Sequence, residues 1–259
     1  MKLLIDFGNT RLKWAVWENA RRTFGGVFAH ADTSLAAALS NNWTALGEPQ
    51  AILVSSVVSA EREEELEKLV IAHFNCPIEF VRSPIVGIGI RNAYAKPARL
   101  GVDRFLAMAA IHAAKPRAQI LLSCGTALTL DALTAEGEHL GGLIAPSPAL
   151  MRSALGKGTA RVGEQVGEPI EIATNTADAA WSGCLLSSVA LIERFRATVV
   201  VRIGGPVAIV GDGGGLDECL RLIPDIERGR DLVLHGLALW SERAGQLIDA
   251  ISVEGARSG

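Results

Sequence analysis

The chain has 259 residues, of which 49% are apolar and 20% charged, and its formal net charge is −3. This length allows one large domain or two of ordinary size, and the composition excludes an intrinsically disordered class. The sequence has no basic run, which argues against a nucleic-acid-binding surface. The first apolar run is interrupted at Asp6, too early for a signal peptide or a membrane span. The four cysteines form no C-x-x-C pair, so we expect a cytoplasmic protein without disulfides or a zinc site, and with neither nucleic acid nor a membrane as partner.

The opening residues predict two strands joined by a glycine turn. LLIDFG is typical of a buried strand and RLKWAVW of its partner, with Gly8-Asn9 in the turn between them. Such a turn can present backbone N–H groups to phosphate oxygens. Asp6 can hold a hydrated Mg²⁺, which needs only one or two carboxylates, and Asn9, Thr10 and Lys13 can then meet the phosphates. The alternative is an ordinary hairpin in which Asp6 bonds the amides of the turn.

The next elements alternate between strand and helix. Residues 52–58 predict a strand, and residues 61–74 predict an amphipathic helix because their apolar side chains recur at helical spacing. Residues 104–114 predict an apolar helix, which Lys115-Pro116 ends. This alternation is typical of an α/β fold.

The stretch QILLSCGTALTLDAL repeats the pattern of the opening residues. With an offset of 117, Gly8 matches Gly125, and Asn9-Thr10 matches Thr126-Ala127. Each copy predicts a strand, a glycine turn and a second strand, which suggests two α/β domains of related design. Two such turns can grip a polyphosphate from both sides, and this favours the phosphate interpretation over an ordinary hairpin.

We expect the domains to be residues 1–116 and 117–259. In the second domain, residues 140–147 predict a strand, 176–196 a long helix and 231–240 a final apolar helix. VAIVGDGGGLDECL predicts a strand, a glycine loop and a helix. GDGGG lacks the G-x-G-x-x-G spacing of dinucleotide-binding folds, which leaves a slot for an adenine ring or a tight turn.

The stretch YAKPARLGVDR places an acid beside an arginine at the start of a predicted helix. The usual role of an aspartate such as Asp103 at that position is to cap the helix. The same position also suits a general base that receives the proton of a substrate hydroxyl. The residues alone leave both roles open.

Four stretches together resemble the type III pantothenate kinases, members of the acetate and sugar kinase/heat-shock ATPase/actin superfamily. The resemblance runs from Met1 to about Trp240 and is specific because the motifs occur in the family's order. They are D-x-G-N-T-x-x-K from Asp6 to Lys13, YAKPARLGVDR, SCGTALTLD and NTADAAWSG.

This resemblance implies two related actin-like (ribonuclease H-like) domains with the nucleotide cleft between them. It implies phosphorylation of pantothenate to 4'-phosphopantothenate by ATP, the first step of coenzyme A biosynthesis, with Asp103 as the proton acceptor. Mg²⁺ would be held by Asp6 through water, and a monovalent cation, K⁺ or NH₄⁺, would be required. A homodimer with shared active sites is also implied, in which Thr176 reaches the pantothenate of the neighbouring subunit. The implied ATP-binding residues are Asp6, Gly8, Asn9, Thr10, Arg11, Lys13, Gly125 and Thr126, and the implied pantothenate-binding residues are Tyr94, Gly101, Val102, Arg104 and Thr176.

The chain departs from the family pattern at two positions. Ser123 replaces the aspartate that usually helps to bind the monovalent cation, so that site must use carbonyls or another acid such as Asp131 if it exists. Ser147 replaces the glycine that usually follows the proline of LIAPS. A regulatory accessory factor with little or no kinase activity is the main alternative function. Sugar or polyphosphate kinases of the superfamily lack the pattern from Tyr94 to Arg104.

Overall fold

Two sheets with the same strand order account for the repeat in the sequence. In each sheet the first three strands pair antiparallel, and a fourth joins parallel to the first. The orders are β3-β2-β1-β4-β5 and β10-β9-β8-β11-β12. The expectation of two related α/β domains is therefore confirmed.

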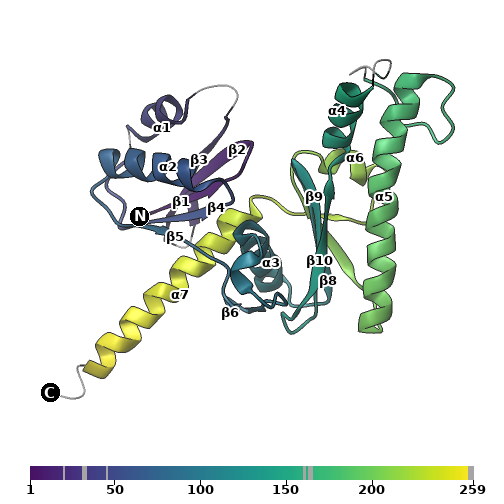
Figure 1. Ribbon diagram of the computed structural model, residues 1–259. Helices are drawn as coiled ribbons and strands as arrows, with labels where there is room; N and C mark the ends of the chain where they lie inside the picture. Colours follow the sequence, from purple (N-terminus) through teal and green to yellow (C-terminus); the bar gives the residue numbers. More distant parts are fainter. Residues whose placement is uncertain (20, 31–33, 45, 160–161, 163–165, 256–259) are drawn as a thin grey trace. The chain divides into compact units, whose positions relative to one another are not determined.

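The computed structural model describes the chain except residues 20, 31–33, 45, 160–161, 163–165 and 256–259 (Figure 1). The described chain divides into two units. Unit 1 comprises Met1–Ala113 together with Asp231–Gly259, and unit 2 comprises Ala114–Arg230. The first boundary lies near the one we expected from the sequence. The last 29 residues differ, because we placed them in the second domain and they belong to unit 1.

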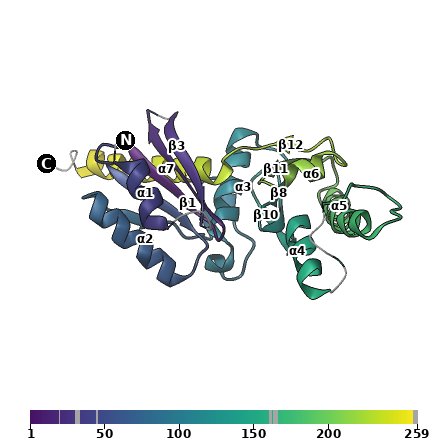
Figure 2. The ribbon, with the colours of Figure 1, turned by 90° about the horizontal axis from the view of Figure 1, so that it is seen from above.

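In unit 1, the alternation of side chains along the strands separates an apolar face from a polar one. Leu3, Ile5 and Phe7 face the core, whereas Asp6 lies on the opposite face. Figure 2 shows α1 and α2 on one side of β1, and their apolar side chains belong to the same core as β1. The elements are β1 Lys2–Phe7, β2 Arg11–Glu18, β3 Arg21–Ala29, α1 Leu35–Trp43, β4 Ala51–Ser56, α2 Ala60–His73, β5 Ile78–Phe80, β6 Val86–Gly87, β7 Ile90–Arg91, the 3-10 helix Pro97–Arg99, α3 Val102–Ala114 and α7 Leu232–Gly255.

Helix α7 belongs to unit 1 because it packs on that unit's elements. The ammonium group of Lys2 donates hydrogen bonds to the backbone carbonyl and the hydroxyl of Ser241. Trp240 donates a hydrogen bond to Glu79, and His235 stacks edge-on against Trp17. The apolar periodicity of this segment predicts a helix correctly, but it carries no information on which sheet the helix covers.

In unit 2, a single long helix covers one face of the sheet. Leu185, Val189 and Ile192 of α5 pack with Ile120 and Leu122 of β8. Figure 1 shows α5 running along the length of this sheet. The elements are β8 Gln119–Cys124, β9 Ala127–Leu133, β10 His139–Pro146, α4 Pro148–Gly158, α5 Thr176–Ile203, β11 Ala208–Asp212, α6 Leu216–Leu220 and β12 Glu227–Arg228. None of the helices in the described part of the chain has the length and hydropathy that a membrane span requires.

Candidate active site

The first glycine turn places an acid and a lysine side by side. Asp6, near the end of β1, pairs directly with Lys13 of β2 across the antiparallel hairpin. Side chains of such a pair lie on the same face, with Cβ atoms about 5 Å apart. The amide of Gly8 donates to the carbonyl of Arg11 at 3.0 Å, so Asn9 and Thr10 form the tip, where both are exposed. The spacing D-x-G-N-T-x-x-K thus produces one carboxylate, one ammonium group and one exposed turn.

Lys13 also has an acidic partner at the start of α7. Its ammonium nitrogen lies 3.8 Å from Oδ1 of Asp231, and Arg22 pairs with the other carboxylate oxygen. Both side chains of the lysine pair are 31% exposed, so water screens the interaction. This contact could not be predicted from local pattern, because more than 200 residues separate the partners.

The segment that precedes α3 is organised by a buried amide. The side chain of Asn92 is 6% exposed, donates to the carbonyls of Pro84 and Pro97, and accepts from the amide of Tyr94. The guanidinium group of Arg104, itself buried, donates to the hydroxyl of Tyr94 at 3.3 Å. Two residues of the predicted pantothenate site are therefore in contact.

Asp103 is the second residue of α3 and so does not occupy the N-cap position. Its Oδ1 accepts a hydrogen bond from the amide of Arg104 at 2.8 Å. A carboxylate in the first turn interacts favourably with the helix dipole, so a structural contribution remains alongside any chemical one. The neighbouring Val102 is buried, whereas Gly101 and Asp103 are partly exposed.

The second glycine turn, in unit 2, is exposed at Gly125 and Thr126. The glycine loop after β11 packs directly behind it, since the amide of Gly215 donates to the carbonyl of Cys124 at 2.9 Å. A Cβ at Gly213, whose φ is +110°, would lie 2.3 Å from that same carbonyl oxygen. Close approach and a positive φ therefore explain why GDGGG contains glycine, as the tight-turn alternative expected.

Cys124 itself has a structural role. Its hydrogen bond with Cys219, together with burial, raises the pKa of the Cys124 thiol far above its usual range. A thiol that stays protonated is a poor nucleophile and a poor metal ligand. All four cysteines are free thiols.

A row of oxygen-bearing side chains crosses the unit 2 sheet at Ser123. Ser123 of β8 pairs with Thr129 of β9 on one side and with Asp212 of β11 on the other. Residues in register on neighbouring strands project from the same face. The hydroxyl oxygen of Thr129 is buried without a hydrogen-bond partner among the described residues. Asp131, in contrast, is fully buried and hydrogen-bonded to His139 at 2.9 Å.

Thr176 is the exposed first residue of α5, and Asn175 is the N-cap. The Asn175 side chain accepts from the amide of Asp178, so Asn175 rather than Thr176 caps the helix. The amide of Glu168 and the side chain of Asn175 lower the pKa of the Asp178 carboxyl. These contacts order the chain around Thr176.

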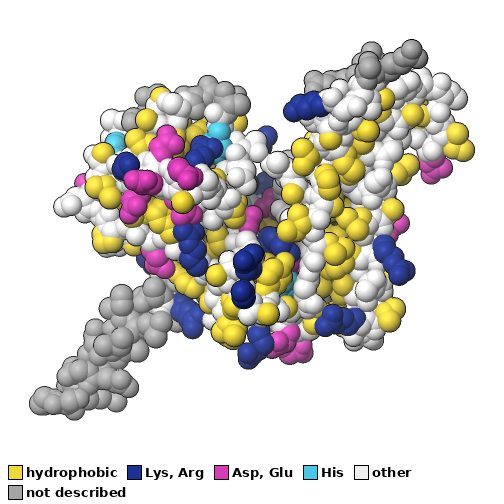
Figure 3. All heavy atoms as spheres, in the orientation of Figure 1, with side chains coloured by type: hydrophobic (Ala, Val, Ile, Leu, Met, Phe, Trp, Pro, Cys, Tyr) yellow, Lys and Arg dark blue, Asp and Glu magenta, His cyan; other side chains and the backbone are white. Residues whose placement is uncertain are grey.

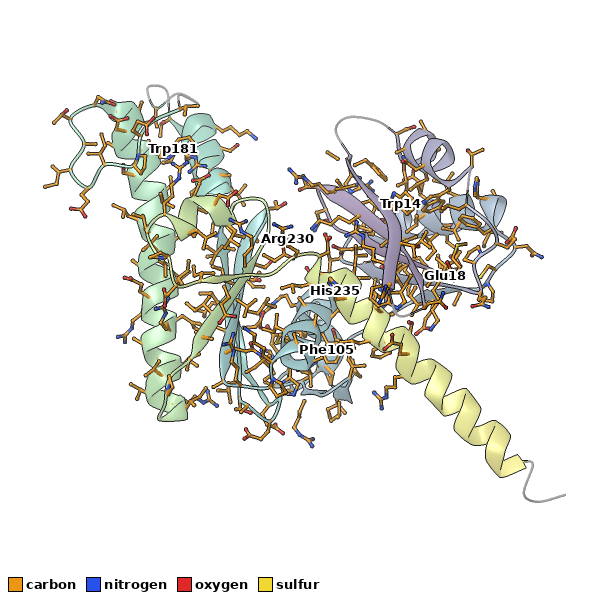
Figure 4. All side chains as sticks on the ribbon, turned by 180° about the vertical axis from the view of Figure 1, so that it is seen from behind. Trp14, Glu18, Phe105, Trp181, Arg230 and His235 are labelled. Atoms are coloured by element: carbon orange, nitrogen blue, oxygen red, sulfur yellow. The ribbon has the colours of Figure 1, made fainter. Side chains whose placement is uncertain are left out.

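An apolar groove of about 760 Å³ lies between α4 and α5. Figure 3 shows apolar side chains gathered over this side of unit 2. Figure 4 places Trp181 on the side of α5 toward α4, and the guanidinium carbon of Arg152 lies 3.8 Å from its ring centre. The groove is lined mainly by Leu150, Met151, Ala154, Leu155, Ala180 and Cys184.

The residues at Asp6 suit a magnesium ion that is bound chiefly by phosphate and water. Mg²⁺ keeps several waters and uses one or two carboxylates beside substrate phosphates. Within the described residues, no group of three or more His, Cys, Asp or Glu side chains is arranged to hold a metal ion. A single carboxylate beside an exposed turn fits a magnesium ion that is bound mainly by phosphate and water.

Sequence reasoning missed several residues that organise these stretches, namely His30, Asn92, Asp212 and Asp231. Asn92 and Asp231 act through side-chain contacts that no pattern in the neighbouring sequence predicts. Asp212 becomes a neighbour of Ser123 only through parallel pairing of β8 with β11. His30 and Ser147 follow the third strand of each repeat, so the offset of 117 relates them, although it does not predict their contacts.

Comparison with known proteins identifies the family. The family model for type III pantothenate kinase matches residues 2–198. The type III pantothenate kinase of Nitrosococcus oceani is 37% identical over 92% of this chain and 92% of its own. That of Laribacter hongkongensis is 40% identical over 92% of this chain and 97% of its own.

A solved structure supports the fold independently. A Listeria monocytogenes protein, provisionally assigned as an N-acetylmannosamine kinase, superposes with a TM-score of 0.56 at 13% identity, covering 93% of this chain and 99% of its own. That likeness shows the shared fold and nothing of the activity or the substrate. The curated relatives are type III pantothenate kinases, enzymes that phosphorylate pantothenate. The chain belongs to the type III pantothenate kinase family.

Proposed function

We propose that this chain phosphorylates pantothenate through Asp103 as general base, with the Asp6–Lys13 hairpin holding the phosphates of ATP. The observation that carries this assignment is the register of β1 and β2, which sets Asp6 directly opposite Lys13 beside an exposed turn. A buried hairpin with only a structural role does not require a charged pair at that place. The exposed turn of unit 2, at Gly125 and Thr126, is proposed as a second phosphate-binding turn.

The chemistry needs little covalent participation by the protein. As the pantothenate hydroxyl oxygen attacks the γ-phosphorus, Asp103 takes the hydroxyl proton, and the bond to the β,γ-bridging oxygen breaks to leave ADP. Lys13 and the turn amides hold the phosphate oxygens in line. Mg²⁺, when bound with ATP, neutralises negative charge on the phosphates. Most of the rate enhancement then comes from positioning and electrostatics.

Tyr94 and Arg104 form the pantothenate-binding part of the proposal. Their hydrogen bond, at 3.3 Å, places a hydroxyl and a guanidinium group side by side. Asn92 fixes the backbone at Tyr94, so the pair is held before substrate arrives. A guanidinium group is well suited to a carboxylate such as that of pantothenate.

We assign the monovalent cation to the row formed by Ser123, Thr129 and Asp212. Hard cations prefer oxygen ligands, and this row offers two hydroxyls and one carboxylate on the same face of the sheet. The charge that Ser123 lacks is supplied by Asp212 from the neighbouring strand. Asp131 is a poorer candidate, because its carboxylate is bound to His139 within the sheet.

The active form is proposed to be a homodimer. Leu150 and Leu155, on α4 beside the groove, are 42% and 38% exposed, and Ile144 of β10 is 65% exposed. An apolar surface of this kind is typical of a subunit interface. Thr176 stands at the exposed start of α5, where it is available to the site of a neighbouring subunit. A cytoplasmic location stays a prediction from the cysteine usage.

One assay tests the proposal as a whole. Purified protein is incubated with pantothenate and Mg-ATP, with and without potassium or ammonium, and phosphopantothenate and ADP are measured. We expect equimolar products. A protein that folds and binds neither substrate would instead favour the accessory-factor alternative.

A further inference from the structure

The residue directly after the third strand of each sheet contacts the glycine turn of the same unit. β3 ends at Ala29 and β10 ends at Pro146, so these residues are His30 and Ser147. They are separated by 117 positions, the same offset that relates the two glycine turns. The two residues therefore occupy equivalent positions in the two units, and the carbonyls that they contact, of Gly8 and Thr126, differ by one position within the turn.

In unit 1, the side chain of His30 makes a hydrogen bond to a backbone carbonyl of the glycine turn. The Nε2 atom of His30 lies 2.8 Å from the carbonyl oxygen of Gly8. A carbonyl oxygen only accepts, so the ring nitrogen must be the donor. The imidazole is itself fixed, because it packs edge-on against Phe7 and Phe28 with ring centres 5.5 and 5.9 Å away. The backbone amide of His30 also donates to the carbonyl of Thr10.

In unit 2, Ser147 contacts a backbone carbonyl of the glycine turn one residue further along than His30 does. Its hydroxyl donates to the carbonyl of Thr126 at 3.0 Å and accepts from the amide of Leu150 at 3.2 Å, as the N-cap of α4. The side chain is 2% exposed. Helix α4 is fixed in turn, because Arg152 forms two hydrogen bonds with Glu218 of α6 and lies over the ring of Trp181.

Because a peptide unit is planar, each of these contacts fixes the orientation of one peptide plane in the turn. In a trans peptide unit the C=O and the following N–H point in opposite directions within one plane. Fixing the carbonyl of Gly8 therefore orients the amide of Asn9, and fixing the carbonyl of Thr126 orients the amide of Ala127. A turn whose peptide planes are already set loses less conformational freedom when phosphate binds.

We propose that His30 and Ser147 are paired positioning residues, each of which orients the peptide plane of one phosphate-binding turn. This inference rests on the proposed nucleotide role of the two turns. Neither residue touches the phosphates under this proposal. Loss of either contact should weaken nucleotide binding while leaving pantothenate binding unchanged.

The test uses the full chain and a non-hydrolysable ATP analogue with Mg²⁺, titrated by calorimetry. His30→Phe keeps the aromatic packing and removes the donor, whereas His30→Gln keeps a side-chain N–H. Ser147→Ala removes both hydrogen bonds, Ser147→Gly largely preserves the helix start, and Ser147→Thr keeps the hydroxyl. We expect the analogue to bind about three- to tenfold more weakly to His30→Phe, Ser147→Ala and Ser147→Gly, the size of one lost hydrogen bond. The Gln and Thr variants should recover most of the affinity.

Ser241→Ala is the matched control. Ser241 is also a buried serine, and its hydroxyl donates to Ala238 and accepts from Lys2, but it lies on α7. This variant should lower the melting temperature without changing analogue affinity. If His30→Phe, Ser147→Ala and Ser147→Gly all bind the analogue as tightly as the control does, the positioning role is wrong while nucleotide binding stands. If the unaltered protein does not bind the analogue, the proposed function and the positioning role are both wrong.

Discussion

The carboxylate of Asp103 occupies the space that a side chain at Gly101 would need. A Cβ built on Gly101 would lie 2.6 Å from Oδ1 of Asp103, closer than real contacts allow. The clash involves the end of a side chain that can turn away, so the fold can survive it. The glycine of the L-G-V-D-R stretch thus permits the observed position of the acid.

We therefore expect Gly101→Ala to lower kcat by about 10- to 100-fold by displacing Asp103, the proposed general base. The melting temperature should change little. Gly205→Ala is the control, since a Cβ at Gly205 meets nothing within 4 Å. Equal turnover of the two variants would show that the position of Asp103 does not matter for catalysis.

Replacing the base itself gives the most direct test. Asp103→Asn keeps the size and the hydrogen bond to the amide of Arg104 but cannot accept a proton. Turnover should fall by about 10²-fold or more with the fold intact. Asp217→Asn, which neutralises an acid in the first turn of α6, controls for loss of a helix-dipole interaction. Near-normal turnover of Asp103→Asn would exclude the assignment of the base.

The metal role of Asp6 predicts a dependence on magnesium concentration. An amide is a poor ligand for a hard cation, so Asp6→Asn should raise the Mg²⁺ concentration needed for half-maximal activity. Higher Mg²⁺ should restore part of the activity. Glu18→Gln, at the exposed far end of β2, should leave the magnesium titration unchanged. Lower thermal stability with unchanged activity would instead support an ordinary structural hairpin.

The cation row predicts that Asp212 determines the response to potassium. Activity and melting temperature are measured against KCl and NH₄Cl at constant ionic strength. The unaltered protein should respond weakly or with altered selectivity, and Asp212→Asn should remove the response, although an Asn Oδ1 can still accept from Gly213. Ser123→Asp should increase activation by potassium. A protein that needs potassium strictly, with or without Asp212, would show that other groups form the site.

Shared active sites predict that two inactive variants complement each other. Asp103→Asn and Thr176→Arg are each expected to be inactive as homodimers. In a mixed dimer, one site carries both changes and the other carries neither. Random exchange of subunits should therefore restore activity at about a quarter of all sites. No recovery on mixing, or a fully active monomer, would contradict the sharing of sites.

Local sequence pattern was sufficient for several helices and strands and for the presence of both glycine turns. The helical spacing in residues 61–74 predicted α2, and the strand alternation around Gly8 and Gly125 predicted both hairpins. The pairing of Asp6 with Lys13 was not predicted, because a two-residue turn at Gly8-Asn9 would pair Asp6 with Arg11. The observed turn has Asn9 and Thr10 at its tip, and this sets Asp6 opposite Lys13. β3 was not predicted, since Gly25-Gly26 interrupts its apolar pattern.

Only the tertiary structure decided which distant segments meet. The period of α7 predicts a helix, but packing against Lys2, Trp17 and Glu79 assigns it to unit 1. Parallel pairing of β8 with β11 makes Asp212 the neighbour of Ser123 across 89 positions. Hydrophobic periodicity indicates only that one face of a helix or strand is buried. Which partner buries that face depends on the shapes and registers of the whole sheet, and these exist only once the chain has folded.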